Sequence, residues 1–304
     1  MFLPLPHLTL AQAPLTCEID AVNEYGEQHK VSIPAERALT VYVDKRELVT
    51  LMTLGAHPEL LVLGYLRNQR LVKSVYDIES ITVDWEVGAA AVKTRQGIAD
   101  IEEKTSRRVV TTGCGQGSMF GGLMDEVDQI ELPPGACITQ SQLYGLVNTI
   151  RLKETTYKSA GSVHACALFG TASGDPEMLF FVEDVGRHNA IDTIAGWMWM
   201  RNTLPINGGS SVFYTTGRLT SEMVIKSAQM GVPVVVSRSG ITQMGHQVAQ
   251  SVGLCAIGRA TNKRFICYAH PHRLKLQAGL VAKLEAKPGS PVDNRSYLKA
   301  GQEA

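Results

Sequence analysis

The stretch that most constrains the fold of this chain runs from residue 178 to residue 198. An apolar run over residues 178–182, short enough for a buried strand, precedes apolar residues at the spacing of a helix with one buried face: Ile191, Ile194, Ala195 and Met198. Gly186 and Asn189 supply the glycine and the helix cap that a turn between strand and helix needs. Four polar residues remain unexplained: Glu183, Asp184, Arg187 and His188. Because α/β proteins bind ligands at the carboxyl ends of buried strands, these residues indicate either a binding site or a salt-bridged turn.

Charge and hydropathy argue against two classes of partner. The chain has 304 residues, enough for two domains, and its 29 basic residues balance 29 acidic ones, so no net charge attracts it to nucleic acid or to an anionic membrane. No apolar run approaches the roughly 20 residues of a spanning helix, and residues 1–17 lack the basic start of a secretory signal. Six scattered cysteines without a CxxC pair fit a reducing cytosol. We therefore expect a cytoplasmic protein with no nucleic-acid or membrane partner.

The first half of the chain is predicted to be rich in β-structure. Strands are expected at residues 31–33, 39–43 and 80–85, and a helix at residues 58–68, which begins with a proline and an acidic first turn. Residues 57–59, His-Pro-Glu, also match the H-x-E that opens the zinc deaminase signature. No P-C-x-x-C follows, and no other cluster has metal-ligand spacing, so we expect neither zinc nor another metal site.

The second half alternates strands and helices. Strands are predicted at residues 163–169, 178–182, 211–214, 232–236, 254–257 and 265–268, and helices at residues 140–152, 188–200, 220–230 and 242–252. This alternation predicts parallel strands with right-handed crossovers, within a mixed α/β sheet flanked by helices and preceded by a smaller β-rich domain. The expected boundaries are an N-terminal tail (1–24), a β-rich domain (25–135), an α/β core (136–276) and a C-terminal tail (277–304).

Arginines follow the carboxyl ends of four of these predicted strands in turn: Arg187, Arg218, Arg238 and Arg259. Because the carboxyl ends of parallel strands meet at one edge, these arginines would form a cationic rim where open sheets bind ligands. The planar guanidinium group suits phosphate, and Lys226, Lys263 and Arg264 can extend the rim. The alternative is four separate arginines, each paired with a nearby carboxylate. Neither a P-loop nor a Rossmann glycine motif occurs, so a nucleotide or another diphosphate would bind in a different way.

Cys114 is the candidate nucleophile. It lies in a segment with five glycines between residues 113 and 122, which we expect to be a mobile loop. A thiol in such a loop is reachable, and Arg107, Arg108 and backbone amides can stabilise its thiolate. A thiolate that must accept an atom and hand it on benefits from a loop that can move between two partners. The alternative is an inert loop cysteine.

The polar turn resembles a known family. Residues 183–192, E-D-V-G-R-H-N-A-I-D, resemble the E-D-V-G-R-H-N-A-x-D stretch of the FdhD family, the formate dehydrogenase accessory sulfurtransferases. Further matches lie at residues 60–66, 162–168, 216–222, 231–239 and 268–273. The resemblance therefore covers residues 25 to 275, most of the chain.

This resemblance implies a cytidine deaminase-like fold without zinc. It also implies a sulfurtransferase that takes persulfide sulfur from a cysteine desulfurase and passes it to molybdenum bis(molybdopterin guanine dinucleotide), which formate dehydrogenase requires. Cys114 would carry the sulfur, and the arginine rim would hold the guanosine diphosphate arms of the cofactor, of which GDP is a partial mimic. The expected partners are the desulfurase, the catalytic subunit of formate dehydrogenase and a second copy of the chain in a homodimer.

The chain departs from the family pattern in two places. The family loop C-G-x-C-G reads C-G-Q-G-S over residues 114–118, which leaves one thiol and excludes a relay between two thiols there. The cofactor-binding segment G-F-x-R-x-G-R reads G-R-A-T-N-K-R over residues 258–264, so we expect altered cofactor binding in detail or specificity. The predicted cofactor-binding residues are Asp184, Arg187, His188, Arg218, Arg238, Arg259, Ala260, Thr261, Asn262, Lys263 and Arg264. Of these, Asp184 and His188 are expected to position the ligand or to shuttle a proton.

Two other functions stay open. A chaperone would bind the molybdenum cofactor or a guanine nucleotide without moving sulfur, as the loss of the second loop cysteine permits. A deaminase-like hydrolase is the other alternative, and the chain lacks the zinc ligands that it would need.

Overall fold

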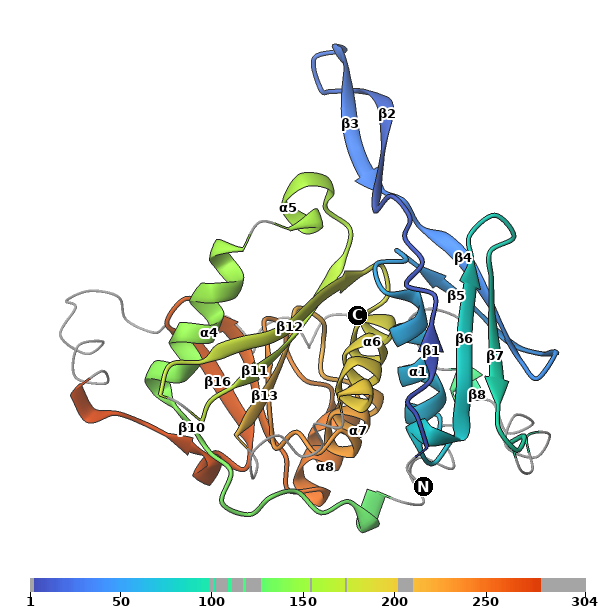
Figure 1. Cartoon of the computed structure of the whole chain (residues 1–304). Helices are drawn as coiled ribbons and strands as arrows, with labels where there is room; N and C mark the ends of the chain where they lie inside the picture. Colours follow the sequence, from blue (N-terminus) through green and yellow to red (C-terminus); the bar gives the residue numbers. More distant parts are fainter. Residues whose placement is uncertain are drawn as a thin grey trace, which may run out of the picture.

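A computed structural model gives the arrangement of the chain (Figure 1). It describes residues 3–98, 101, 109–110, 117–118, 127–153, 155–172, 174–201 and 210–279. Cys114 and most of the predicted C-terminal tail lie outside the described residues. The fold is mixed α/β, as predicted, with a five-stranded and a six-stranded sheet and helices packed between and outside them.

The six-stranded sheet has the strand order β12-β11-β13-β14-β15-β16. Its strands are β11 (His164–Gly170), β12 (Glu177–Asp184), β13 (Ser211–Thr215), β14 (Val234–Ser237), β15 (Cys255–Thr261) and β16 (Arg264–Ala269). The predicted parallel arrangement is confirmed for β13, β14 and β15. The sheet is nevertheless mixed, because β11 runs antiparallel to both of its neighbours and β16 runs antiparallel to β15.

Helices cover both faces of this sheet. On one face lies α4 (Gln140–Leu152), and on the other lie α6 (Arg187–Met200), α7 (Ser221–Gln229) and α8 (Gln243–Ser251). The alternation along β13 shows the two cores directly, since Val212 and Tyr214 pack in the core with α4 and Phe213 packs in the core with the other helices. Burial on both faces explains why β13 and β14 are buried along their whole length.

The five-stranded sheet has the order β1-β6-β7-β4-β5. Its strands are β1 (His7–Leu8), β4 (Arg37–Val43), β5 (Arg46–Thr53), β6 (Ile78–Asp84) and β7 (Ala89–Thr94). The predicted helix α1 (Pro58–Asn68) has the same bounds in the structure, and its leucines pack against the buried side chains of β4 and β6. The sequence did not predict β5 or β7. The alanine-rich β7 has little strand propensity of its own and is held by pairing with β4 and β6.

The two halves of the molecule meet where α1 crosses α6, between the two sheets (Figure 1). Gly64 of α1 faces Gly196 of α6, and a Cβ atom added to Gly64 would lie 2.7 Å from the backbone nitrogen of Gly196 and closer still to the oxygen of Asp192. Only glycine lets the two helix backbones approach this closely. The crossing therefore joins the β-rich layer to the α/β layer.

A hairpin of β2 (Thr16–Val22) and β3 (Gln28–Pro34) projects from the body of the molecule (Figure 1). The segment 1–24, predicted to be a loose tail, thus contains β1 and β2. The turn between β2 and β3 supports the hairpin, because the Asn23 side chain accepts hydrogen bonds from the backbone nitrogens of Tyr25 and Glu27, and Gly26 has a positive φ. β1 is held by pairing with β6.

Short elements complete the described chain. The 3-10 helices are η1 (Val75–Asp77), η2 (Val127–Gln129) and η4 (Pro271–Arg273), and one short α-helix is α5 (Thr156–Ala160). The short strands are β8 (Val109–Val110), β9 (Gly117–Ser118), β10 (Ile138–Thr139) and β17 (Leu274–Lys275). Residues 117–118, predicted to lie in a loop, instead pair with β8 as a two-residue strand. Across the described ranges, no helix combines the length and the apolar character needed to cross a membrane.

Candidate functional site

The carboxyl ends of four strands meet at one edge of the six-stranded sheet. β12 runs in the same direction as β13, because both are antiparallel to β11, and β14 and β15 run parallel to β13. Arg187, Arg218 and Arg238 follow the first three of these strands. Arg259 lies within β15, where it has a positive φ of 51° and the pairing with β16 is irregular. The topology thus brings the four arginine positions to the same edge.

A cavity of about 300 Å³ opens at this edge, next to the C-terminal half of α4 and the segment around α5. Four of the predicted residues line it: Arg238, Ala260, Thr261 and Asn262. Side chains of Phe181 and Tyr214 supply aromatic surface. Burial raises the pKa of Tyr214 to about 12, despite the opposing charge of Arg238, so its hydroxyl keeps its proton at neutral pH. The cavity therefore combines aromatic surface with a hydroxyl and a guanidinium group.

Three further cations line the same cavity: Arg151, Lys153 and Lys158. The ammonium group of Lys153 lies 4.8 Å from the centre of the Phe181 ring, a cation–π distance. The sequence did not point to these residues, because they lie at the end of α4 or within α5 rather than at strand ends. A partial signal was present, since Arg151 and Lys153 flank the end of the helix predicted at residues 140–152 and Lys158 follows five residues later.

Glu183 shapes the wall of this cavity. Its carboxylate accepts hydrogen bonds from the backbone nitrogens of Thr156, at 2.7 Å, and Tyr157, at 3.3 Å. These bonds attach the start of α5 to the end of β12, because the first backbone N–H groups of a helix have no partner within the helix. Glu183 therefore holds α5 over the sheet edge.

A second cavity, of about 530 Å³, lies beside the first and shares Thr261 with it. Arg259, Lys263 and Arg264 line it, together with Gln140 and Tyr144 of α4. The predicted segment 258–264 is thus divided between two neighbouring cavities, with its large cations in the second.

Arg187 and Arg218 line neither of these two cavities. They lie instead near His164, at the start of β11. Burial lowers the pKa of His164, and the positive charges of Arg187 and Arg218 lower it further. Arg187 is itself buried and packs its methylene groups against Gly217. The structure therefore separates the predicted rim into two groups. Arg187 and Arg218 lie near β11, whereas Arg238 and Arg259 line the cavities.

Asp184 is bonded on both of its carboxylate oxygens. One oxygen accepts from the Thr53 hydroxyl and from the backbone nitrogen of Leu54, at 3.0 Å. The other accepts from the backbone nitrogen of Gly186, at 2.9 Å, and from the Asn189 amide, at 2.8 Å. Burial raises the pKa of Asp184 although these hydrogen bonds act in the opposite direction. The four bonds tie the β12–α6 turn to the end of β5, while the expected ligand contact stays a prediction.

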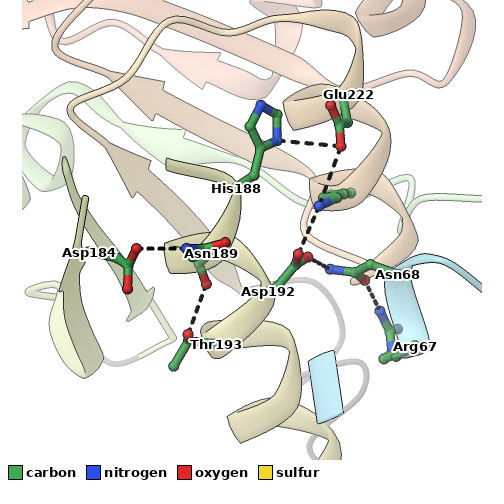
Figure 2. A network of polar contacts seen from close by, with 9 residues as sticks. Arg67, Asn68, Asp184, His188, Asn189, Asp192, Thr193 and Glu222 are labelled. Atoms are coloured by element: carbon green, nitrogen blue, oxygen red, sulfur yellow. Dashed lines mark hydrogen bonds and ion pairs between the residues drawn. The ribbon is translucent and has the colours of Figure 1, made fainter. Parts of the chain in front are cut away.

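His188 begins a buried polar network that crosses the molecule (Figure 2). Its Nδ1 atom lies 3.5 Å from Glu222, and the Lys226 ammonium group lies between Glu222, at 3.5 Å, and Asp192, at 2.9 Å. Asp192 also accepts a hydrogen bond of 2.7 Å from Asn68 of α1. Burial lowers the pKa of His188 to about 2, helped by the charges of Lys226, Arg187 and His164. The imidazole is therefore neutral at physiological pH and adds no positive charge to the site.

Cys114 lies outside the described residues, so its predicted role stays a prediction. Within the residues that the structure describes, no three His, Cys, Asp or Glu side chains are grouped so that they could hold a metal ion.

Comparison with known proteins decides the family. The profile of the FdhD/NarQ family matches residues 34–275. The chain belongs to the FdhD/NarQ family. One relative, the sulfur carrier protein FdhD of Bacillus subtilis (strain 168), is 31% identical over 260 residues, covering 83% of this chain and 94% of the relative. Another, the sulfur carrier protein FdhD of Staphylococcus haemolyticus (strain JCSC1435), is 28% identical over 244 residues, covering 80% of this chain and 90% of the relative.

A solved structure supports the FdhD fold. The crystal structure of a proposed formate dehydrogenase accessory protein from Desulfotalea psychrophila matches with a TM-score of 0.67 at 21% sequence identity. The match covers 86% of this chain and 100% of the other. The family resemblance read from residues 183–192 is thus confirmed, whereas the finer likeness to cytidine deaminases stays a prediction.

Proposed function

We propose that this FdhD-family chain is a sulfurtransferase in the cytoplasm. It takes persulfide sulfur from a cysteine desulfurase and passes it to molybdenum bis(molybdopterin guanine dinucleotide), its substrate, for use by formate dehydrogenase. The observation that carries the proposal is the cationic, aromatic cavity at the sheet edge, in a chain whose relatives bear the name sulfur carrier protein.

The lining of the cavity suits a guanosine diphosphate arm of this substrate. Phe181 and Tyr214 offer flat apolar surface to a base, and Arg151, Lys158 and Arg238 offer positive charge to a diphosphate. The neighbouring cavity with Arg259, Lys263 and Arg264 offers a second cationic site, and a cofactor with two such arms can use both. A volume of about 300 Å³ lies within the range of small-molecule sites.

The sulfur-loading step needs one thiol in this chain. The Cys114 thiolate attacks the outer sulfur of the desulfurase persulfide, which forms a new S–S bond on Cys114 and releases the desulfurase cysteine as a thiolate. No electrons are gained or lost overall, so a single loop cysteine is sufficient for loading.

Asp184 and His188 act at the turn between β12 and α6. Asp184 positions this turn through its four internal hydrogen bonds. His188 is kept neutral by burial, so it positions the ligand or passes a proton without adding a charge. The partners of the protein are the desulfurase, the catalytic subunit of formate dehydrogenase and a second copy of the chain.

The proposal is tested by loading the purified protein from a cysteine desulfurase and cysteine. The wild-type protein is expected to gain about 32 mass units at Cys114, the mass of one sulfur atom. Cys114→Ala should gain none and should fail to activate formate dehydrogenase, while keeping its affinity for GDP. Cys137→Ala, a half-buried cysteine of the same chain, serves as the matched control and should load normally. Full activation of formate dehydrogenase by Cys114→Ala would contradict the transfer role.

The loss of the second loop cysteine favours one alternative, a cofactor or guanine-nucleotide chaperone that moves no sulfur. The same experiment separates the two, because the chaperone would bind GDP but gain no mass at Cys114.

A further inference from the structure

Cys255 and Cys267 bring two thiols together on the α4 face of the six-stranded sheet. Cys255 lies on β15 and Cys267 on the neighbouring antiparallel strand β16, and their Sγ atoms are 3.9 Å apart. Neither cysteine lines the cavities described above. We propose that this pair is a redox-active dithiol, which closes reversibly into a disulfide by exchange with low-molecular-weight disulfides.

The local geometry allows this closure. A disulfide bond is about 2.05 Å long, so the two sulfur atoms must approach each other by about 2 Å. Rotation of the cysteine side chains provides part of the approach. The strand pairing provides the rest, because the register between β15 and β16 shifts between Ala256 and Ile257, directly beside Cys255. An irregular ladder yields to a small displacement more easily than a regular one does.

The two thiols have different roles because their surroundings differ. Cys255 is fully buried, whereas Cys267 is half-buried and can be reached from solvent. A hydrogen bond from the Cys255 thiol lowers the pKa of Cys267, and the same contact together with burial raises the pKa of Cys255. Cys267 is therefore the attacking thiol, and Cys255 is the resolving thiol.

The reaction proceeds by two exchanges. The Cys267 thiolate attacks a sulfur of the small disulfide, forms a mixed disulfide and releases one small thiolate. Cys255 then loses its proton and attacks the Cys267 sulfur, which forms the Cys255–Cys267 bond and releases the second small thiolate. The two protein thiols are oxidised, the small disulfide is reduced to two thiols, and these take up the protons.

Cys166 provides an internal reference for this reactivity. It is fully buried, and burial raises its pKa to about 12 although the hydrogen bond between its sulfur and the Thr215 hydroxyl, at 3.3 Å, acts in the opposite direction. Such a thiol is inert towards a small disulfide, so it should stay unmodified in the folded protein.

The test uses the full-length protein, reduced, freed of reductant and then incubated with oxidised glutathione. Trypsin separates the two cysteines into peptides 239–259 and 265–273. The expected product is these two peptides joined, about 2 mass units lighter than their reduced sum. In Cys255→Ser the resolving thiol is absent, so glutathione should stay attached to Cys267. In Cys267→Ser, the buried Cys255 should take up no glutathione and should form no disulfide.

Two outcomes would overturn the proposal. One is the absence of the joined peptides from wild-type protein in which the exposed Cys17 has already taken up glutathione. Another is a glutathione adduct on Cys267 that is as abundant in wild-type protein as in Cys255→Ser, because Cys255 would then not resolve it. Thermal melting checks that the serine variants are folded, and the wild-type digest decides the question if they are not.

Discussion

A Lys226→Met variant is expected to lose about 3–5 kcal/mol of unfolding free energy, because it leaves two buried carboxylates without their cation. Lys226 is 1% exposed, and its ammonium group lies 2.9 Å from Asp192 and 3.5 Å from Glu222. Methionine fills a similar volume, so the loss reports the charge rather than a cavity. Urea unfolding followed by circular dichroism measures it.

Lys93→Met is the matched control for this variant. Lys93 forms an ion pair with Glu79 at 2.7 Å, but both side chains are largely exposed to water. An exposed pair contributes at most about 1 kcal/mol, so this variant should unfold almost as the wild-type protein does. Equal losses in the two variants would show that the burial of the Lys226 network has no energetic consequence.

A Gly64→Ala variant is expected to be destabilised by about 3 kcal/mol or more, because its Cβ atom has no room between α1 and α6. The atoms that it would meet are the backbone oxygen of Asp192 and the backbone nitrogen of Gly196. A side chain can rotate away from a clash, but helix backbone cannot, so the two helices must separate. The midpoint of thermal unfolding is the simplest measure.

Gly135→Ala controls for the general effect of replacing a glycine. A Cβ atom on Gly135 meets no atom within 4 Å, and its backbone does not have a positive φ. This variant should melt at or above the wild-type temperature. If Gly64→Ala melted at the same temperature as Gly135→Ala, the close crossing of α1 and α6 would be wrong.

Local sequence was sufficient to predict several elements. The helices at residues 58–68 and 140–152 have the predicted bounds, and Pro58 marks the start of the first. By contrast, β7 is an alanine-rich strand that only pairing stabilises, and β2 lies within residues 1–24, which were predicted to be a tail. Such elements depend on partners that local sequence does not show.

The candidate site was predictable where it follows from topology. Placing arginines after successive strands was enough to bring Arg187, Arg218 and Arg238 to one edge. The sequence did not show that Arg187 would pack near His164, away from the cavity of Arg238. It also did not show that Asp184 would be bonded by Thr53, a residue far away in the sequence. Contacts between distant segments decide such details, and one sequence does not contain them explicitly.

The central claim is that the cavity around Arg238 binds a guanosine diphosphate arm, and calorimetric titration with GDP tests it most directly. The wild-type protein should bind GDP, and Arg238→Gln should bind it about tenfold more weakly or worse, since a charged hydrogen bond to phosphate is lost. Arg46 lies on β5 of the five-stranded sheet, so Arg46→Gln should bind GDP as the wild-type protein does. Failure of the wild-type protein to bind GDP, or undiminished binding by Arg238→Gln, would contradict the account.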